Sequence, residues 1–479
     1  MGTLSGYVGS GFCEMTANGG STRAHYRPLV ARFDEFDIDG IKARAHLVES
    51  LFRRQGITFA VYGEEEGLER TWPLDIFPRI ISSEEWSEIE TGLMQRVRAL
   101  NAFLDDIYQG DQEILREGVV PRWLVESSTG YLPEATGVPV PVGGRCVVSG
   151  IDLVRDGEGV YRVLEDNLRV PSGISYVLEN RVAMTRVLPK AFSRYRVRPV
   201  ADFGASLLTT LQSLAPPGIE DPVVVVLTPG VHNSAYFEHA FLARLMGVEL
   251  VEGRDLVVDG RVVYSRTTRG LARVDVIYRR VGDEFLDPVV FRPDSLLGVP
   301  GIMSAVRAGT VALANPVGNG AADDKGVYPY VPRMIQYYLG EEAILPNVET
   351  YLPWEPDELD YVVENVERLV IKPVAEAGGQ GIVFGPSSDE KMLETVIADI
   401  RSNPRGFIAQ EVIQLSTHPT FTENGIAPRH IDLRPFVLSG VNGIHVVPGG
   451  LTRVALREGS LVVNSSRGGG SKDTWVLTD

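Results

Sequence analysis

Cysteine, histidine and long apolar runs are all scarce in this 479-residue chain. Cys13 and Cys146 show no CxxC spacing, the seven histidines are scattered and HExxH is absent, which argues against a disulfide scaffold and a His/Cys zinc site. No run of about 18 apolar residues predicts a membrane-spanning helix. The first residues lack the basic and apolar segments of a secretory signal. We therefore expect a cytoplasmic protein without a membrane partner.

Basic residues are also in deficit. Lys and Arg number 46 against 63 Asp and Glu, a net charge of −17, which argues against non-specific binding to nucleic acid or anionic membranes. A local basic pocket for a phosphorylated ligand stays compatible with this balance. With 44% hydrophobic and 23% charged residues, the composition is that of a globular protein, and the length predicts roughly two or three subdomains.

The two commonest nucleotide-binding signatures are missing. GxxxxGK[ST] does not occur, and GNGAAD at 318–323 breaks GxGxxG at its last position. A nucleotide site in this chain would therefore use another fold.

Four segments differ in composition and periodicity. The expected segments are a flexible, Gly/Ser/Thr-rich N-terminal tail (1–22), helices followed by a hairpin and another helix (23–198), an α/β part with a parallel sheet (199–316), and an α+β part (317–479). Within 84–117, apolar residues recur at steps of three and four and predict one buried helix face. Long strands are expected at 429–438 and 444–456.

A candidate metal site lies in the predicted hairpin at 146–167. Asp152 is on its first strand, and Glu165 and Asn167 share a face of the second, within VLEDNLRVPSG (163–173). An Asp-Gly turn between the strands brings residue 152 close to residues 163–165. Three oxygen donors without His or Cys suit Mg²⁺.

Two segments carry lysines beside glycine or carboxylate. EAGGQGI (376–382) follows a strand that ends in Lys372, an arrangement in which backbone N–H groups and an ammonium can bind a triphosphate. A plain flexible hairpin is the alternative. ADDKG (322–326) carries Asp323, Asp324 and Lys325, and a solvated charged turn is the alternative there.

Two strands place polar groups where an apolar strand ends. FIAQEVI (407–413) holds Gln410 and Glu411 and could form an adenine-binding hinge or contain a structural salt bridge. In HIDLRPFVL (430–438), Asp432 and Arg434 share a strand face, where Arg434 could meet a phosphate or a cross-strand carboxylate.

Together these motifs resemble the ATP-grasp superfamily in permuted order, with the Asp and ExN block first and the lysines, glycine loop, hinge and DxR arginine after it. The similarity is to the circularly permuted ATP-grasp type 2 family, and through it to glutathionylspermidine synthetase-like enzymes. It extends from ITFAVYG (57–63) to GGGSKDTWVL (468–477). The implied fold class is α/β and α+β, a circularly permuted ATP-grasp fold with a Rossmann-like parallel-sheet subdomain.

The resemblance implies roles by position. The metal ligands are Asp152, Glu165 and Asn167; the phosphate-binding and catalytic residues are Lys325, Lys372 and Arg434; the covering loop is Gly378, Gly379, Gln380 and Gly381; and the adenine hinge is Gln410, Glu411, Val412 and Ile413. Candidates for gripping an acidic substrate are Arg169, Ser172, Arg453, Arg467 and Lys472. The cofactors implied are ATP and Mg²⁺, with Mn²⁺ as the alternative metal.

The implied activity is ATP-dependent ligation of a carboxylate to an amine through an acyl phosphate. The alternatives are an ATP- or peptide-binding subunit of a larger assembly, with an unknown companion protein, and an ATP-grasp kinase. Glutathionylspermidine synthetases carry an arginine two positions before the first metal Asp, where this chain has Gly150, so their own substrates are not expected. The glycines at 468–470 are expected to form a lid hinge or to belong to a disordered tail.

Overall fold

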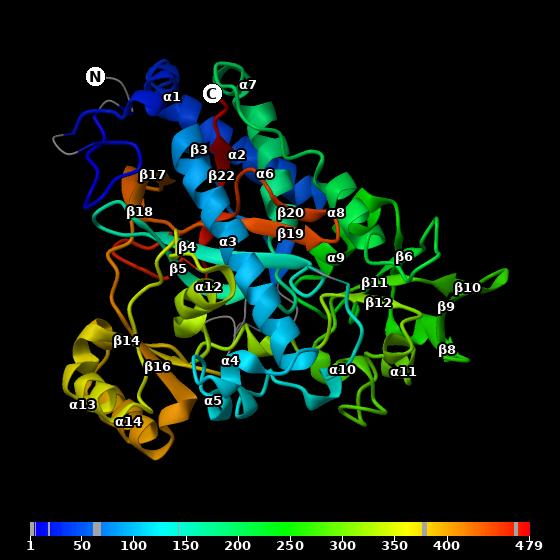
Figure 1. The fold of residues 1–479 in the computed structure, drawn as a ribbon. Coiled ribbons are helices and arrows are strands. Elements are labelled where there is room, and N and C mark those ends of the chain that lie inside the picture. Colours follow the sequence, from blue (N-terminus) through cyan, green and yellow to red (C-terminus); the bar gives the residue numbers. More distant parts are fainter. Residues whose placement is uncertain are drawn as a thin grey trace.

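A central antiparallel sheet joins the front and the back of the sequence. In the computed structural model, which describes residues 4, 6–17, 20–60, 69–141, 143–375, 381–463 and 468–479, its strand order is β20 (Gly443–Val446), β19 (Phe436–Gly440), β4 (Val148–Arg155), β5 (Tyr161–Asn167). The predicted hairpin is thus confirmed as β4–β5. Figure 1 shows it beside the C-terminal strands that pair with β4, the arrangement a permuted chain requires.

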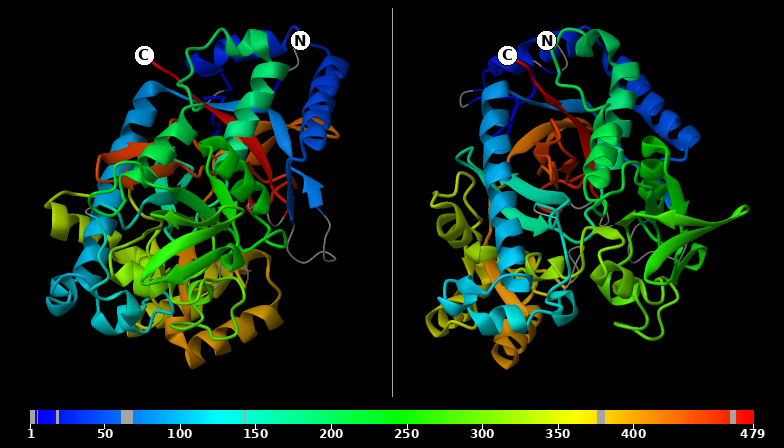
Figure 2. Two further views of the ribbon diagram at one scale, coloured as in Figure 1. Left: turned by 90° about the vertical axis from the view of Figure 1, so that its right-hand side faces the viewer. Right: turned by 45° about the vertical axis from the view of Figure 1, so that its right-hand side comes forward.

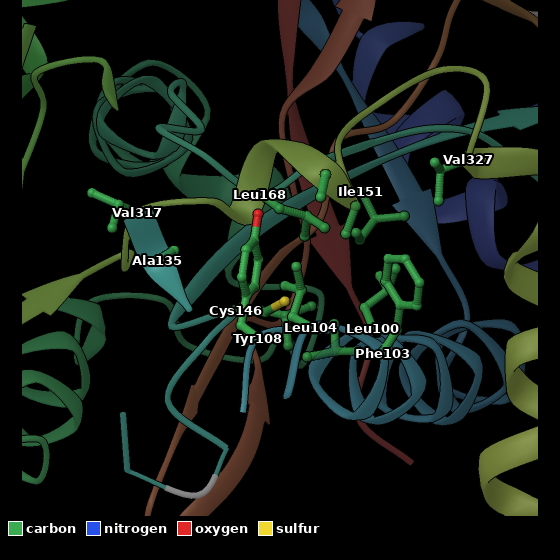
Figure 3. Packing of buried hydrophobic residues seen from close by; sticks show 14 of the residues in the cluster. Leu100, Phe103, Leu104, Tyr108, Ala135, Cys146, Ile151, Leu168, Val317 and Val327 are labelled. Carbon is green, nitrogen blue, oxygen red and sulfur yellow. The ribbon is translucent and has the colours of Figure 1, made fainter. Parts of the chain in front are cut away.

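The long helix α3 (Ser83–Tyr108) packs across this sheet. Its N-terminus is fixed by a capping box in which Ser82 and Glu85 each accept a hydrogen bond from the other's backbone N–H. The predicted apolar face is buried, and Figure 3 shows Leu100, Phe103 and Leu104 packed against Ile151 and Cys146. The helix ends before the predicted residue 117, and α4 (Glu113–Arg116) resumes after a turn.

The α/β part contains the expected parallel sheet. All neighbours are parallel in the order β12 (Ala312–Ala314), β11 (Val276–Arg279), β6 (Val224–Leu227), β7 (Glu249–Val251). A ribbon of β8 (Leu256–Asp259), β9 (Val262–Thr267) and β10 (Gly270–Val274) projects from it, as the views of Figure 2 show. Its associated helices are α8 (Phe203–Gln212), α9 (Tyr236–Met246), α10 (Asp283–Leu286) and α11 (Ile302–Arg307).

A smaller lobe carries the predicted lysine strand and hinge strand. Its antiparallel sheet has the order β13 (Thr350–Tyr351), β16 (Phe407–Glu411), β14 (Leu369–Pro373), β15 (Val383–Phe384). Helices α13 (Pro356–Asn365) and α14 (Glu390–Ser402) cover one face with their own apolar cluster (Figure 1). Of the glycine loop between β14 and β15, residues 376–380 lie outside the described part of the chain.

The remaining helices and strands lie in the N-terminal region and around the sheets described above. They are α1 (Arg27–Phe33), α2 (Ile38–Gln55), β1 (Thr58–Ala60), β2 (Glu69–Thr71), β3 (Leu74–Ile81), α5 (Arg122–Glu126), α6 (Ile174–Val187), α7 (Pro189–Phe192), α12 (Val331–Leu339), β17 (Thr417–Thr422), β18 (Gly425–His430), β21 (Thr452–Val454) and β22 (Gly470–Val476). Within the described residues, no helix is both long and apolar enough to cross a bilayer.

The prediction of a flexible N-terminal tail needs correction. Its described residues are packed, because the backbone of Cys13 forms an isolated β-bridge with Thr417 and Glu14 is only 2% exposed. The Glu14 carboxylate accepts hydrogen bonds from Arg79 (2.6 Å) and Arg155 (2.9 Å). The guanidiniums of Arg79 and Arg155 need a counter-charge inside the fold. The glycine and serine content of the first residues gives no sign of this requirement, because the two arginines lie far away in sequence.

The C-terminal expectations also need correction. The two long strands are interrupted, because Pro435 and Pro448 lack the N–H that a continuous ladder needs. The segment from Gly470 is no tail: β22 is buried throughout, antiparallel to β21 and parallel to β3. The irregular backbone before β19 carries Asp432 and Arg434.

Replacing Glu14 by Ala should strongly destabilise the fold. The change leaves the guanidiniums of Arg79 and Arg155 buried without their shared carboxylate, at an expected cost of about 3–5 kcal/mol in the free energy of unfolding. Urea unfolding of parent and variant measures this cost. Glu49→Ala, which removes an exposed pair with Arg53, is the matched control and should change stability by less than about 1 kcal/mol. Equal midpoints for E14A and the parent would show that the N-terminal segment does not contribute to folding.

Candidate active site

The β4–β5 hairpin brings the three predicted oxygen donors together. Asp152 and Glu165 are direct register partners, and Asn167 lies opposite Gly150. The Asn167 amide nitrogen is 3.4 Å from Asp152 Oδ1 and 3.5 Å from Glu165 Oε1. The three side chains therefore converge on one point, as the spacing predicts.

Two arginines surround Asp152. Arg434 donates from Nε to Oδ1 (2.5 Å) and from Nη2 to Oδ2 (2.8 Å), and Arg453 donates to Oδ2 (2.6 Å). Arg453 also binds both oxygens of Asp432 through its Nε at 3.0 Å. Burial alone would raise the pKa of Asp152, but the two guanidiniums outweigh it and hold that pKa well below its usual range. Asp432 and Arg434 thus face the same cluster, each in a cross-strand ion pair.

Lys372 lies on the other side of Glu165. Its side chain extends from β14 and is 9% exposed. Burial lowers the pKa of Lys372 to about 8, with the Glu165 carboxylate opposing and Lys325 adding to the shift. Burial and the charge of Asp152 raise the pKa of Glu165, against the opposing charges of Arg434 and both lysines. The charged side chains therefore form a wall in which the pKa values of Glu165 and Lys372 depend on the neighbouring charges.

A cavity of about 330 Å³ opens from this wall, called here the large cavity. Apolar side chains from the small lobe and the C-terminal segment line most of it: Val370, Ile382, Phe384, Ile413, Leu415, Leu461, Val462 and Val463. Asp152, Glu165, Lys325 and Lys372 close its charged end. An apolar slot ending in mixed charges has the character of a site for an amphipathic ligand.

The predicted hinge strand forms one side of the large cavity. Gln410, 2% exposed, donates from Nε2 to Thr350 (2.9 Å), while its Oε1 is a buried acceptor without a partner among the described residues. Glu411 accepts from the hydroxyls of Tyr351 (2.9 Å) and Tyr361 (3.1 Å), and it forms no salt bridge with a described residue, which disfavours the structural salt bridge that was the alternative to a hinge. Ile413 lines the cavity as well.

A second cavity of about 60 Å³, called here the small cavity, shares Leu164, Glu165, Lys325 and Lys372 with the large one. Asp323 and Arg169 line it and form an ion pair of 2.5 Å. Burial raises the pKa of Asp323 against the opposing charge of Arg169. Asp324 is also buried and binds Arg405 at 2.8 Å. The ADDKG segment is therefore not a solvated turn.

The candidate substrate-gripping residues do not form one group. Arg169 lies at the small cavity, and the Ser172 backbone oxygen accepts from Arg434 (3.4 Å). Arg453 lines the large cavity and is paired there with Asp152 and Asp432, so its role toward a substrate stays a prediction. Lys472 is 1% exposed on β22 and binds Asp75 at 2.5 Å, so its charge is neutralised inside the fold, which corrects its expected role.

Four predicted loop residues cannot be placed. Gly378, Gly379, Gln380 and Arg467 lie outside the described residues. Gly381 follows them with a φ of +67° and packs so tightly on Pro373 that a Cβ would lie 2.8 Å from its ring.

One supporting ion pair escaped the sequence reasoning. Asp166, between Glu165 and Asn167, points to the opposite face of β5, where Arg96 of α3 binds both its oxygens at 2.7 and 2.6 Å. Strand alternation could have indicated this, because neighbours on a strand face opposite sides. The pair anchors the hairpin to the long helix.

The donor set fits a hard divalent cation. Two carboxylates and an amide converge, and a half turn of the Asn167 amide would present its oxygen in place of its nitrogen. No group of three or more His, Cys, Asp or Glu side chains is arranged to hold a metal in the described chain, and the set here consists of two carboxylates and an amide. Arg434 at present lies against Asp152 and 3.6 Å from Glu165, so a cation would share these carboxylates with a guanidinium.

Comparisons with known proteins bear on the family and the fold. Residues 78–455 match the family model described as circularly permuted ATP-grasp type 2. The chain is 52% identical over 469 residues to an uncharacterized protein of Synechocystis, covering 98% of this chain and 97% of that protein. An uncharacterized Mycobacterium tuberculosis protein is 54% identical over 97% of this chain and 84% of its own length.

Two further similarities concern named proteins. A Frankia alni protein, provisionally named glutamate–cysteine ligase 2-3, is 44% identical over 99% of this chain but only 54% of its own length. A glutathione synthetase-like effector of Globodera pallida, solved in its apo form, superposes with a TM-score of 0.61 at 12% identity, over 92% of this chain and 98% of that one. At that identity the likeness shows the fold alone.

The amine of Lys372 should titrate near pH 8 in the protein free of nucleotide and metal. Competitive acetylation at a series of pH values, with the modified peptide quantified by mass spectrometry, measures the midpoint. Glu165→Gln should move the midpoint below that of the parent, because the Glu165 carboxylate holds the lysine pKa up against burial. An unchanged midpoint in E165Q would contradict the electrostatic contact between the two groups.

Proposed function

The chain belongs to the circularly permuted ATP-grasp type 2 family, and on this basis we propose that it is a Mg²⁺- and ATP-dependent ligase that joins a carboxylate to an amine. The large cavity would hold ATP, with adenine between the apolar walls and the triphosphate at the charged end. Asp152, Glu165 and Asn167 would hold Mg²⁺, or Mn²⁺ in its place.

One juxtaposition carries the proposal. The apolar cavity contains a buried amide acceptor, Gln410 Oε1, on one side, and is also lined by two lysines and by the carboxylates of Asp152 and Glu165. An adenine amino group is a donor that could satisfy Gln410, whereas the lysines suit phosphate oxygens. A simple apolar ligand would leave Gln410 Oε1 without a hydrogen-bond donor.

The residues would act by positioning and charge neutralisation. When bound, the metal ion would draw negative charge from the phosphate oxygens. Lys325 and Lys372 would neutralise the β- and γ-phosphates, and Arg434 would stabilise the γ-phosphoryl group as it passes to a substrate carboxylate oxygen, leaving ADP. The amine nitrogen, after losing a proton, would form the C–N bond of the amide as the acyl carbon–oxygen bond breaks and phosphate departs.

Gly150 shapes the acyl end of the site. A Cβ at this position would lie 3.1 Å from Pro171 and 3.4 Å from the Arg434 side chain. A longer side chain at this position would crowd Pro171 and contact Arg434, which lies beside Asp152. This difference supports a carboxylate substrate unlike that of glutathionylspermidine synthetases.

The Frankia alni relative supports a ligase, but the substrates in its name are not carried over to this chain. The provisional ligase name belongs to a protein of which this chain matches 54%, so the remainder of that protein could carry the named activity. A subunit of a larger assembly and a kinase are the competing functions. The presence of both lysines, Arg434 and the three metal donors in one site favours an active enzyme over a subunit that only binds.

Glu165→Ala should reduce the affinity for ATP in the presence of Mg²⁺ at least about tenfold, because a proposed metal ligand is lost. Titration calorimetry with a non-hydrolysable ATP analogue, with and without Mg²⁺, measures the change. Glu158→Ala, in the exposed turn of the same hairpin, is the matched control and should bind as the parent does. An unchanged Mg²⁺ dependence in E165A would remove Glu165 from the metal site.

Hydroxylamine trapping separates the ligase from its alternatives. With Mg²⁺, ATP and pooled amino acids, peptides and dicarboxylic acids, the ligase should form hydroxamate and ADP in equal amounts, since hydroxylamine intercepts an acyl phosphate. ADP formed with a phosphorylated hydroxyl product and no hydroxamate would identify a kinase. ATP binding without ADP formation in any pool would favour the subunit.

A further inference from the structure

The small cavity adjoins the proposed nucleotide site, because Glu165, Asn167, Lys325 and Lys372 line it. It lies across the wall of Glu165, Lys325 and Lys372 from the large cavity, where phosphoryl transfer would take place. Its volume of about 60 Å³ leaves room for a head group of a few non-hydrogen atoms. Its outer side is formed by Asp323 and Arg169, and the Arg169 side chain is 46% exposed.

Asp323 differs from Asp166 and Asp152 because the cation paired with it, Arg169, is much more exposed to solvent. Asp166 is held by Arg96, whose side chain is 1% exposed, and Asp152 by Arg453, 8% exposed. Removing either buried guanidinium would leave a charge stranded in the interior. The Arg169 side chain is 46% exposed and that of Asp323 10% exposed, so Arg169 can move into water when another cation takes its place beside Asp323. The Asp323 carboxylate is thus largely buried, while the cation paired with it can be exchanged for another.

We propose that Asp323 binds the primary ammonium group of an amine, which replaces the Arg169 guanidinium in the small cavity, and that this amine is the ligase's second substrate. The assignment to a second substrate rests on the proposed function; the ammonium site itself does not. An amine bound here would stand beside Glu165 and Lys372, next to the end of the large cavity where the acyl phosphate would form.

The charges around the small cavity explain why a carboxylate is needed there. Lys325 and Lys372 repel a further cation, and Asp323 and Glu165 offset them. Asp166 also lines the cavity, but both its oxygens are bound to Arg96. Leu168 N–H donates to Asp323 Oδ1 at 3.3 Å and Arg169 to Oδ2. Arrival of an ammonium would therefore release Arg169 while leaving Oδ1 oriented by the backbone.

The reactivity of Arg169 tests this exchange. Phenylglyoxal modification of Arg169, followed by peptide mass spectrometry, is compared in methylammonium chloride and in tetramethylammonium chloride at equal concentration. Methylammonium fits the cavity and donates hydrogen bonds, whereas tetramethylammonium carries the same charge but has no N–H. We expect modification about fivefold faster in methylammonium, the factor that a half-exposed ion pair can contribute. Equal rates in the two salts would overturn the proposal.

Two variants sharpen the result. Asp323→Asn should make Arg169 react rapidly in both salts, because the pair is already broken. Asp324→Asn changes the adjacent carboxylate, which binds Arg405 and the Gly326 N–H, and should respond as the parent does. A methylammonium response that persists in D323N would place the ammonium elsewhere. The assay contains neither ATP nor metal, so its outcome is separate from hydroxamate formation, whose absence would instead refute the ligase.

Discussion

The ion-pair cluster around Asp152 is the constraint on which the site depends. Asp152 and Asp432 share Arg453, and Asp152 also binds Arg434, with all four side chains largely buried. Each removal would strand a charge in the interior, so the members must be present together. The cluster also joins the sheets: Arg453 comes from β21, Asp152 from β4, and Arg79 of β3 donates to the Asp432 backbone oxygen at 3.2 Å. The same ion pairs thus position the residues of the candidate site and hold the sheets together.

The irregular backbone next to the cluster follows from the same arrangement. Pro435 and the Pro448–Gly450 turn interrupt what would otherwise be a regular hairpin, and the Gly450 backbone approaches that of Arg434 so closely that a Cβ would lie 2.6 Å from its carbonyl oxygen. Arg434 is therefore presented from a fixed, non-ladder position. From there it can contact Asp152 and reach toward Glu165, 3.6 Å away. A bound cation would compete with this guanidinium for the carboxylates.

Local patterns predicted those parts of the molecule in which the contacting residues are close in sequence. The hairpin that joins Asp152 to Glu165 and Asn167 needs only a turn signal and strand alternation, and the buried face of α3 needs only helical periodicity. The parallel sheet followed from strands alternating with helices. The family match and the shared fold confirm the predicted circularly permuted ATP-grasp architecture.

Partners distant in sequence were the main source of error. Glu14 is buried because Arg79 and Arg155 need its charge, and Lys472 because β22 lies between β3 and β21 opposite Asp75; neither partner is visible in the adjoining residues. The two carboxylate partners of Arg453, Asp152 and Asp432, also lie outside the residues that adjoin it in sequence. The measurement closest to the central claim is a crystal structure with Mg²⁺ and a non-hydrolysable ATP analogue. The account predicts adenine beside Gln410 and metal coordination by Asp152, Glu165 and Asn167; nucleotide bound outside the large cavity, or metal held by other residues, would contradict it.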